Sequence, residues 1–210
     1  PPAGEAASGL AVAPRGSEMA RRSRALQPDG LDEEGYGREL PQAVEAANAC
    51  IRGEGESNPQ RRGMGTTLTA VWIRADRAEV AQVGDSRAYL FRGGRLRQLT
   101  KDQSLVGKLI EDGIITEDEA ERMAGRNIIL QALGTDEPLD VAHQTERLAP
   151  GDSLLLCTDG LSGVVNNHDL EAEMQKGGAP AEICARLVEL ANHRGGPDNI
   201  TVLLAKTAKA

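Results

Sequence analysis

The chain has 210 residues, a formal net charge of −8 and a sequence pI near 5.0. A chain of this length can form one domain with a complete core and does not require a second. The acidic balance argues against nucleic acid or an anionic membrane surface as the main partner, because their phosphates would repel it. No apolar run approaches the roughly 18 residues of a membrane span, and no signal peptide is visible.

The three cysteines, Cys50, Cys157 and Cys184, are odd in number, widely spaced and without a CxxC motif. This spacing excludes a zinc ribbon and argues against a disulfide framework, so it favours a reducing compartment. We therefore expect a cytoplasmic protein. Aromatic residues make up only 2% of the chain, which predicts a core of aliphatic and small side chains.

The first third of the chain is polar and rich in small residues. Residues 4–13 fit a short helix, and the arginine-rich stretch 14–35 is predicted to be a solvated, mobile loop. A helix is predicted at about 39–53, because apolar residues there recur three or four positions apart.

Alternating side chains replace this helical period in the middle of the chain. Strands are predicted at 65–73 and 78–85, and a hairpin at 87–99 around the pair Gly93-Gly94. Two short helices follow, the first at 104–113. The second begins at Thr116, with Glu119 three residues on, which is a capping-box pattern.

The last third combines strands with one long helix. Strands are predicted at 141–148, 152–159 and 199–206, and a helix at 180–193. Because short strands occur in runs and helices interrupt them at only a few points, the order favours antiparallel sheets with helices packed outside.

Three acidic residues share one local pattern, since Asp85, Asp159 and Asp198 each lie at the end of an apolar strand and close to glycine. If the three strand ends converge, their carboxylates repel one another unless cations lie between them, and such oxygen ligands suit magnesium or manganese rather than zinc. A single aspartate at a strand end is more often a turn residue that bonds its own backbone. Asn199 has the same two readings, as a turn cap or as a support for a neighbouring carboxylate.

Four motifs resemble a known family, the metal-dependent serine/threonine protein phosphatases of type 2C, also called PPM. They are VGDSRAYL, LTKDQS, LLLCTDGL and GGPDNITVLL, in the family's order and approximate spacing. GMGTTL at 63–68 is similar to the family's strand before the GDSR hairpin, and AGEAAS at 3–8 to its first helix. The resemblance covers nearly the whole chain, from Ala3 to Lys206.

The resemblance implies a fold and a site. The fold would be a single α+β domain over 1–210, a four-layer α-β-β-α sandwich of two antiparallel sheets flanked by helices, with a variable flap at 104–134. Asp159 and Asp198 match the family's ligands of two metal ions and would act through metal-bound water, whereas Asp85 matches a ligand of an additional ion. Gly160 and Asn199 would lie around these ligands. The cofactor would be two or three magnesium or manganese ions.

The same resemblance implies a reaction and partners. The reaction would be hydrolysis of phosphoserine or phosphothreonine in proteins, opposing a serine/threonine kinase in a bacterial cytosol. The histidines, His143, His168 and His193, are interpreted as exposed or capping residues. Many relatives have histidine in place of Gln103, which leaves the role of that position open.

One departure from the family keeps two hypotheses open. The family's first metal-binding aspartate lies in a DG-x-GG element before AGEAAS, whereas this sequence begins at Pro1. The resemblance therefore implies an N-terminally incomplete sandwich, with weakened metal binding and reduced turnover. The first hypothesis is a phosphatase whose first strands this sequence does not include; the alternative is a catalytically incomplete phosphatase-like module that binds a protein partner.

Overall fold

The structure is a computed structural model that describes residues 33–116, 119–120, 123, 125, 128–135 and 138–208. The helix predicted at 4–13, the AGEAAS motif, and the predicted mobile loop up to residue 32 lie outside the described residues. The described chain separates into two compact units. The single domain predicted for 1–210 stays a prediction.

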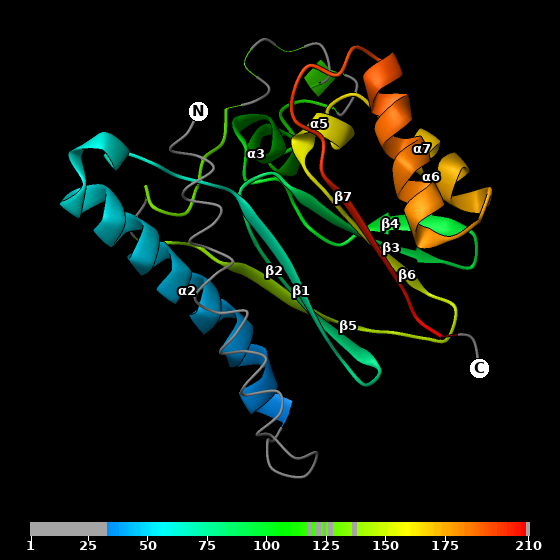
Figure 1. Ribbon diagram of the computed structural model, residues 1–210, viewed down its shortest axis with the longest axis horizontal. Helices are drawn as coiled ribbons and strands as arrows, with labels where there is room; N and C mark the ends of the chain where they lie inside the picture. The colour runs from blue at the N-terminus through cyan, green and yellow to red at the C-terminus, as the bar shows by residue number, and fades with distance from the viewer. Residues whose placement is uncertain are drawn as a thin grey trace. The chain divides into compact units, whose positions relative to one another are not determined.

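Unit 1 holds the described residues up to Trp72, together with Glu79–Gly84 and Gln103–Thr145. Its longest element is the helix α2, Glu33–Ser57 (Figure 1). The helix is longer at both ends than the predicted span of 39–53, and it continues through Pro41. Proline cannot donate a hydrogen bond to the carbonyl four residues back, a cost that the burial of one helix face offsets. The buried residues of that face are Leu40, Val44, Ala47 and Ile51.

The sheet beside α2 has the strand order β1-β2-β5, formed by Leu68–Arg74, Arg77–Val83 and Ala142–Arg147. All three strands lie within the predicted spans or one residue beyond them. The central strand β2 has a neighbour at each edge and is buried from Ala78 to Val83. Side chains of α2 pack with Ala81, Val83 and Leu133 into one apolar cluster. The short 3-10 helix η1, Pro59–Arg61, follows α2.

The start of the predicted flap segment, 104–134, lies beside a later part of the same segment in unit 1. Ser104 caps the helix α3, Leu105–Glu111, and forms an isolated bridge with Ile129. Farther along, Thr116 and Glu119 exchange the hydrogen bonds of the predicted capping box, at 2.8 Å from Thr116 N–H to the carboxylate and 3.3 Å in return.

Unit 2 holds Ile73–Ala78, Asp85–Asp102 and the described residues from Glu146 on. Its sheet has four antiparallel strands in the order β4-β3-β6-β7. They are Arg95–Gln98, Arg87–Arg92, Ser153–Cys157 and Val202–Lys206. The predicted hairpin is confirmed, since Arg92 pairs with Arg95 across Gly93 and Gly94, whose φ angles are 58° and 80°. Positive φ at both central residues is what a two-residue hairpin turn requires.

Helices cover one face of this sheet. The short helix α5, Asp159–Ser162, follows β6 directly, and α6, Asn167–Gln175, and α7, Pro180–His193, lie beside each other over the strands (Figure 1). The span predicted for α7 is confirmed. The two antiparallel sheets with their flanking helices also confirm the α+β class. The core beneath α6 and α7 is aliphatic apart from one tyrosine and two sulfur-containing residues: Tyr89, Leu155, Cys157, Leu161, Val165, Leu170, Met174, Ile183, Leu187 and Ala191.

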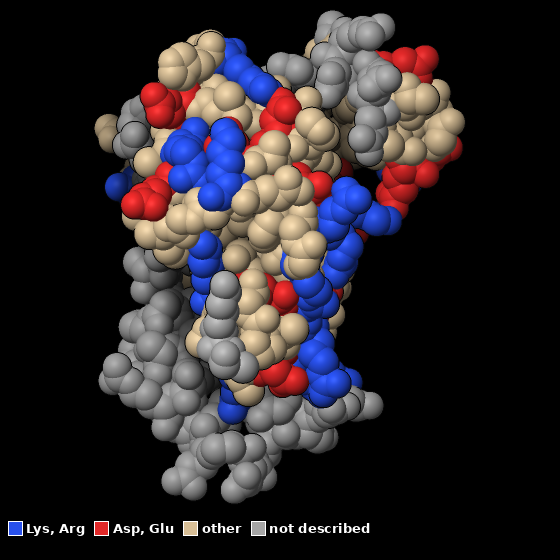
Figure 2. Space-filling view, turned by 90° about the vertical axis from the view of Figure 1, so that its right-hand side faces the viewer, with Lys and Arg blue, Asp and Glu red and all other residues tan. Residues whose placement is uncertain are grey.

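The surface carries charges of both signs. On the face drawn in Figure 2, lysine and arginine side chains lie beside aspartate and glutamate side chains. Ion pairs such as Arg92–Asp152 and Arg97–Glu146, both at 2.6 Å, join the two signs in unit 2. Among the described helices, none combines the length and the apolarity needed to cross a bilayer.

Candidate active site

The register of the four-stranded sheet brings the three candidate aspartates of unit 2 to one end. Arg87 of β3 pairs with Cys157 of β6, and Cys157 pairs with Val202 of β7. Asp85 precedes β3, Asp159 follows β6 and Asp198 precedes β7. Because antiparallel neighbours run in opposite directions, all three residues lie beyond the same end of the sheet.

Hydrogen bonds join the TDGL segment, residues 158–161, to the DNIT segment, residues 198–201. The Thr158 hydroxyl donates to the Asn199 carbonyl at 3.2 Å and accepts from the Thr201 amide at 3.0 Å. The Thr158 amide donates to the Thr201 carbonyl at 3.2 Å. A threonine before Asp159 therefore fixes the path of the chain that follows Asp198.

Gly160 lets these two segments approach closely. A β-carbon at Gly160 would lie 2.2 Å from the Asn199 carbonyl oxygen, so any side chain there would push the segments apart. The predicted support role of Gly160 and Asn199 around the ligands stays a prediction, although both residues lie beside candidate ligands. Asn199 contacts Asp198 through its backbone, whose amide donates to Asp198 Oδ1 at 2.7 Å.

The carboxylates of this end are electrostatically coupled. Burial, together with the negative charges of Asp159 and Asp102, raises the pKa of Asp85 to about 6. Burial also raises the pKa of Asp159, as does the negative charge of Asp198. A carboxylate whose pKa is raised in this way is stabilised by a nearby cation.

Asp102, from the LTKDQS motif, is a member of the acidic group that was missing from the predicted set. Its charge raises the pKa of both Asp85 and Asp159. The Arg87 guanidinium donates to both Asp102 carboxylate oxygens, at 2.8 Å from Nε and 2.6 Å from Nη2. This two-point contact gives Asp102 a fixed orientation. We call Asp85, Asp102, Asp159 and Asp198 the acidic cluster.

The donor set of the acidic cluster fits a hard divalent cation, because it offers only carboxylate oxygens that repel one another. Across the residues that the structure describes, no three His, Cys, Asp or Glu side chains are close enough to hold one ion as they stand. The carboxylates instead act on one another in pairs, Asp85 with Asp159 and with Asp102, and Asp159 with Asp198 and with Asp102. Asp159 therefore interacts with each of the other three.

The histidines lie outside the acidic cluster. His193 is exposed at the end of α7, where its Nδ1 lies 2.9 Å from the Glu189 carbonyl, and His168 is exposed beside Asp169. His143 differs from the prediction of an exposed or capping residue. Its Nε2 lies 2.8 Å from Glu79, which also accepts from Thr145, because a buried glutamate requires polar partners.

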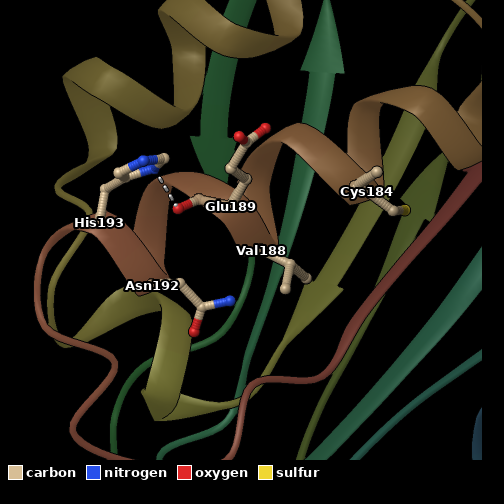
Figure 3. Close-up of a pocket in the computed structure, with 6 residues that line it drawn as sticks. Cys184, Val188, Glu189, Asn192 and His193 are labelled. Atoms are coloured by element: carbon tan, nitrogen blue, oxygen red, sulfur yellow. Dashed lines mark hydrogen bonds between the residues drawn. The ribbon is translucent and has the colours of Figure 1, made fainter.

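A groove on α7 lies apart from the acidic cluster in its lining residues. Figure 3 shows that it follows one face of that helix, and its lining consists of Cys184, Ala185, Val188, Glu189, Asn192 and His193. The dashed contact in the figure is the helix-end contact of His193. Members of the acidic cluster are not among the lining residues, so we place the candidate site at the end of the sheet.

Comparisons with known proteins identify the family that the chain resembles. A family model described as protein phosphatase 2C matches residues 2–200. The chain is 42% identical over 166 residues to the serine/threonine protein phosphatase PstP of Mycobacterium tuberculosis, covering 79% of this chain and 32% of the relative. It is 37% identical over 167 residues to the serine/threonine phosphatase stp of Listeria welshimeri, covering 80% and 66%. The chain thus spans about a third to two thirds of the length of these relatives.

A solved structure with metal ions is also similar. The catalytic domain of the phosphatase PstP in complex with two manganese ions matches with a TM-score of 0.83 and 35% identity. The match covers 99% of this chain and 83% of that one. The similarity therefore extends over both units of the chain.

Proposed function

Because this chain belongs to the protein phosphatase 2C family, we propose that it takes part in the metal-dependent hydrolysis of phosphoserine and phosphothreonine in proteins. The observation that carries the proposal is the acidic cluster, where three strand ends from distant parts of the chain bring coupled carboxylates together. The relatives carry the names of serine/threonine phosphatases, which supports the same reaction.

We propose that the metal ions are magnesium or manganese. Asp159 and Asp198 would hold ions of the two-metal centre, and Asp85 would hold an additional ion, with Asp102 beside it. When bound, such ions activate water for attack on phosphorus and offset the charge of the phosphoryl oxygens. The structure of a relative with two manganese ions supports this choice of metal.

The chain's own residues would hold these ligands in place. Thr158 joins the turn into Asp159 to the chain that follows Asp198, and Gly160 provides the space between the two segments. Arg87 orients Asp102 and supplies a positive charge next to Asp85. Rigid supports of this kind keep like charges near one another before a cation arrives.

The substrates that we propose are phosphorylated proteins. A kinase that transfers phosphate to serine or threonine must supply these esters, so we propose a serine/threonine kinase as the opposing enzyme. We also propose a cytoplasmic location. It is supported by Cys50, Cys157 and Cys184, all of which are free thiols, because free thiols are typical of reducing compartments.

The test is manganese-dependent hydrolysis of an aryl phosphate by the full-length protein. We expect Mn²⁺ to stimulate hydrolysis and Asp159→Ala to abolish the stimulated activity. Asp76→Ala is the matched control, because this exposed aspartate pairs with the exposed Arg147 side chain at the surface of the same unit. Hydrolysis that survives in Asp159→Ala and does not depend on metal would contradict the proposal.

A catalytically incomplete module is the second candidate function. It is favoured by the finding that, within the described ranges, no three possible ligands stand close enough to share one ion. A module of this kind would bind a phosphoprotein without turning it over. Absence of Mn²⁺-stimulated hydrolysis in the full-length protein, together with retained binding of a phosphopeptide, would select it.

A further inference from the structure

We propose that Gln103 is a positioning residue for the acidic cluster, because its hydrogen bonds hold the backbone directly beside both Asp85 and Asp102. The inference rests on the proposed function, since it assigns a role within that same site. It also gives a role to a position whose contribution the sequence leaves open.

Two reciprocal hydrogen bonds join Gln103 to Gly84. The Gly84 backbone amide donates to the side-chain oxygen Oε1 of Gln103 at 2.7 Å. The Gln103 backbone amide donates in return to the Gly84 carbonyl at 2.9 Å. Gly84 is the residue before Asp85, and Gln103 is the residue after Asp102. The pair of bonds therefore fixes the distance between the two points from which these carboxylates leave the backbone.

The Gly84 peptide has little freedom of its own. Its φ of 102° lies in a region that side chains rarely adopt, and a β-carbon would lie 2.4 Å from Thr67 Cγ2. Its carbonyl accepts a second hydrogen bond, from Gln82 Nε2 at 3.1 Å. Gly84 packs against Thr67 on one side, so its contact with Gln103 determines where the chain turns into Asp85.

The side-chain nitrogen of Gln103 also forms a hydrogen bond. Its Nε2 donates to the Asp140 carbonyl at 2.9 Å, and the Gln103 carbonyl accepts from the Leu130 amide at 2.8 Å. An amide can accept at one end and donate at the other, whereas an apolar side chain of the same length can do neither. The contacts thus call for the hydrogen-bonding ability of glutamine and not only for its size.

This tie has a consequence for metal binding. Like charges held close together separate when their backbone is free to move, which lowers the affinity for the cation that would bind between them. Removing the side-chain bond between Gln103 Oε1 and the Gly84 amide should weaken metal binding while leaving each carboxylate present. A residue that only stabilised the fold would not change metal affinity in a protein that stays folded.

The chain offers a matched control in Gln131. Its Oε1 accepts from the Asp140 amide at 2.9 Å, so Gln131 and Gln103 hold the same loop residue. Of these two side chains, Gln103 is the one that bonds Gly84. Comparing Gln103→Met with Gln131→Met separates the holding of Gly84 from the holding of the Asp140 loop.

The experiment measures two quantities in the full-length protein. In the metal-free state, we expect Gln103→Met to speed hydrogen exchange of the Gly84 amide about 10-fold. With metal, we expect it to weaken Mn²⁺ binding in calorimetric titration, also about 10-fold. Gln131→Met should leave both quantities within about twofold of the wild type. Unchanged exchange at Gly84, or equal losses of Mn²⁺ affinity in the two variants, would overturn the proposal.

A second variant covers the case in which Gln103→Met does not fold. Gln103→Glu keeps an oxygen to accept from Gly84 and loses the donor to Asp140, so the Gly84 amide should stay protected; faster exchange there would overturn the proposal. The exchange measurement needs no metal. Failure of the proposed function would appear as a wild-type protein that neither binds Mn²⁺ nor hydrolyses substrate, whatever happens at Gly84.

Discussion

Asp159 and Asp198 lie at the same end of the neighbouring strands β6 and β7, where burial and then the negative charge of Asp198 raise the pKa of Asp159. Because these like charges repel one another, the metal-free protein should be more stable with one carboxylate fewer. The destabilisation caused by this repulsion can therefore be measured directly in variants that lack one carboxylate.

The first prediction concerns Asp85 and pH. Its folded-state pKa of about 6 lies above the ordinary value of 3.8. Between these values the folded chain binds more protons than the unfolded chain, so the free energy of unfolding falls as pH rises through this window. We expect Asp85→Asn to raise the Tm of the metal-free protein above about pH 6, by about 2–4 °C for each kcal/mol gained. The gain should shrink as pH falls below about 6 and vanish near the ordinary value.

Asp152→Asn is the control of opposite sign for that experiment. The hydrogen bond from Arg92 holds the pKa of Asp152 below its ordinary value. Its contribution to stability is present above about pH 4 and is lost only as pH falls further. Thermal scans in a chelator across this range should show Asp85→Asn as stabilising and Asp152→Asn as destabilising at neutral pH. The same sign for both variants would contradict the account.

The second prediction concerns the close approach at Gly160. Its missing side chain leaves room for the Asn199 carbonyl, which would lie 2.2 Å from a β-carbon. We expect Gly160→Ala to lower the free energy of unfolding by about 1–3 kcal/mol, despite the better helix propensity of alanine. Gly53→Ala in α2, where nothing lies within 4 Å of the added carbon, should instead stabilise the protein by about 0.5–1 kcal/mol. Urea unfolding measures both, and a neutral Gly160→Ala would exclude the contact.

The third prediction concerns the pair Arg87–Asp102. Removing the guanidinium in Arg87→Met leaves a carboxylate without its two-point partner, and we expect a loss of about 1–3 kcal/mol. Lysine cannot reproduce the two-point contact, so Arg87→Lys should recover only part of the loss. A double-mutant cycle with Asp102→Asn isolates the coupling energy. A coupling near zero would mean that Arg87 does not orient Asp102.

Much of unit 2 could be predicted from local sequence signals. The pair Gly93-Gly94 requires positive φ and marked the hairpin, and Pro180 and His193 bound α7 as the pattern indicated. The apolar stretch before Thr158 became β6 as expected. These signals work because turn and cap residues act within a few positions of the chain.

Features that depend on tertiary contacts escaped the sequence. The helix α2 continues through Pro41 because packing of its buried face offsets the missing hydrogen bond. Asp102 does not follow a long apolar strand, so the pattern that identified the other three aspartates could not select it; its place in the quoted LTKDQS motif was the available signal. The convergence of the acidic cluster depends on strand register, which sequence order alone does not specify.

The central claim is that carboxylates from three strand ends share divalent cations. The most direct measurement is anomalous scattering from crystals of the full-length protein soaked with Mn²⁺. We predict a manganese peak within bonding distance of the carboxylate oxygens of Asp159 and Asp198, and its loss in Asp159→Asn. Peaks found only elsewhere in a protein that hydrolyses aryl phosphate with Mn²⁺ would contradict it.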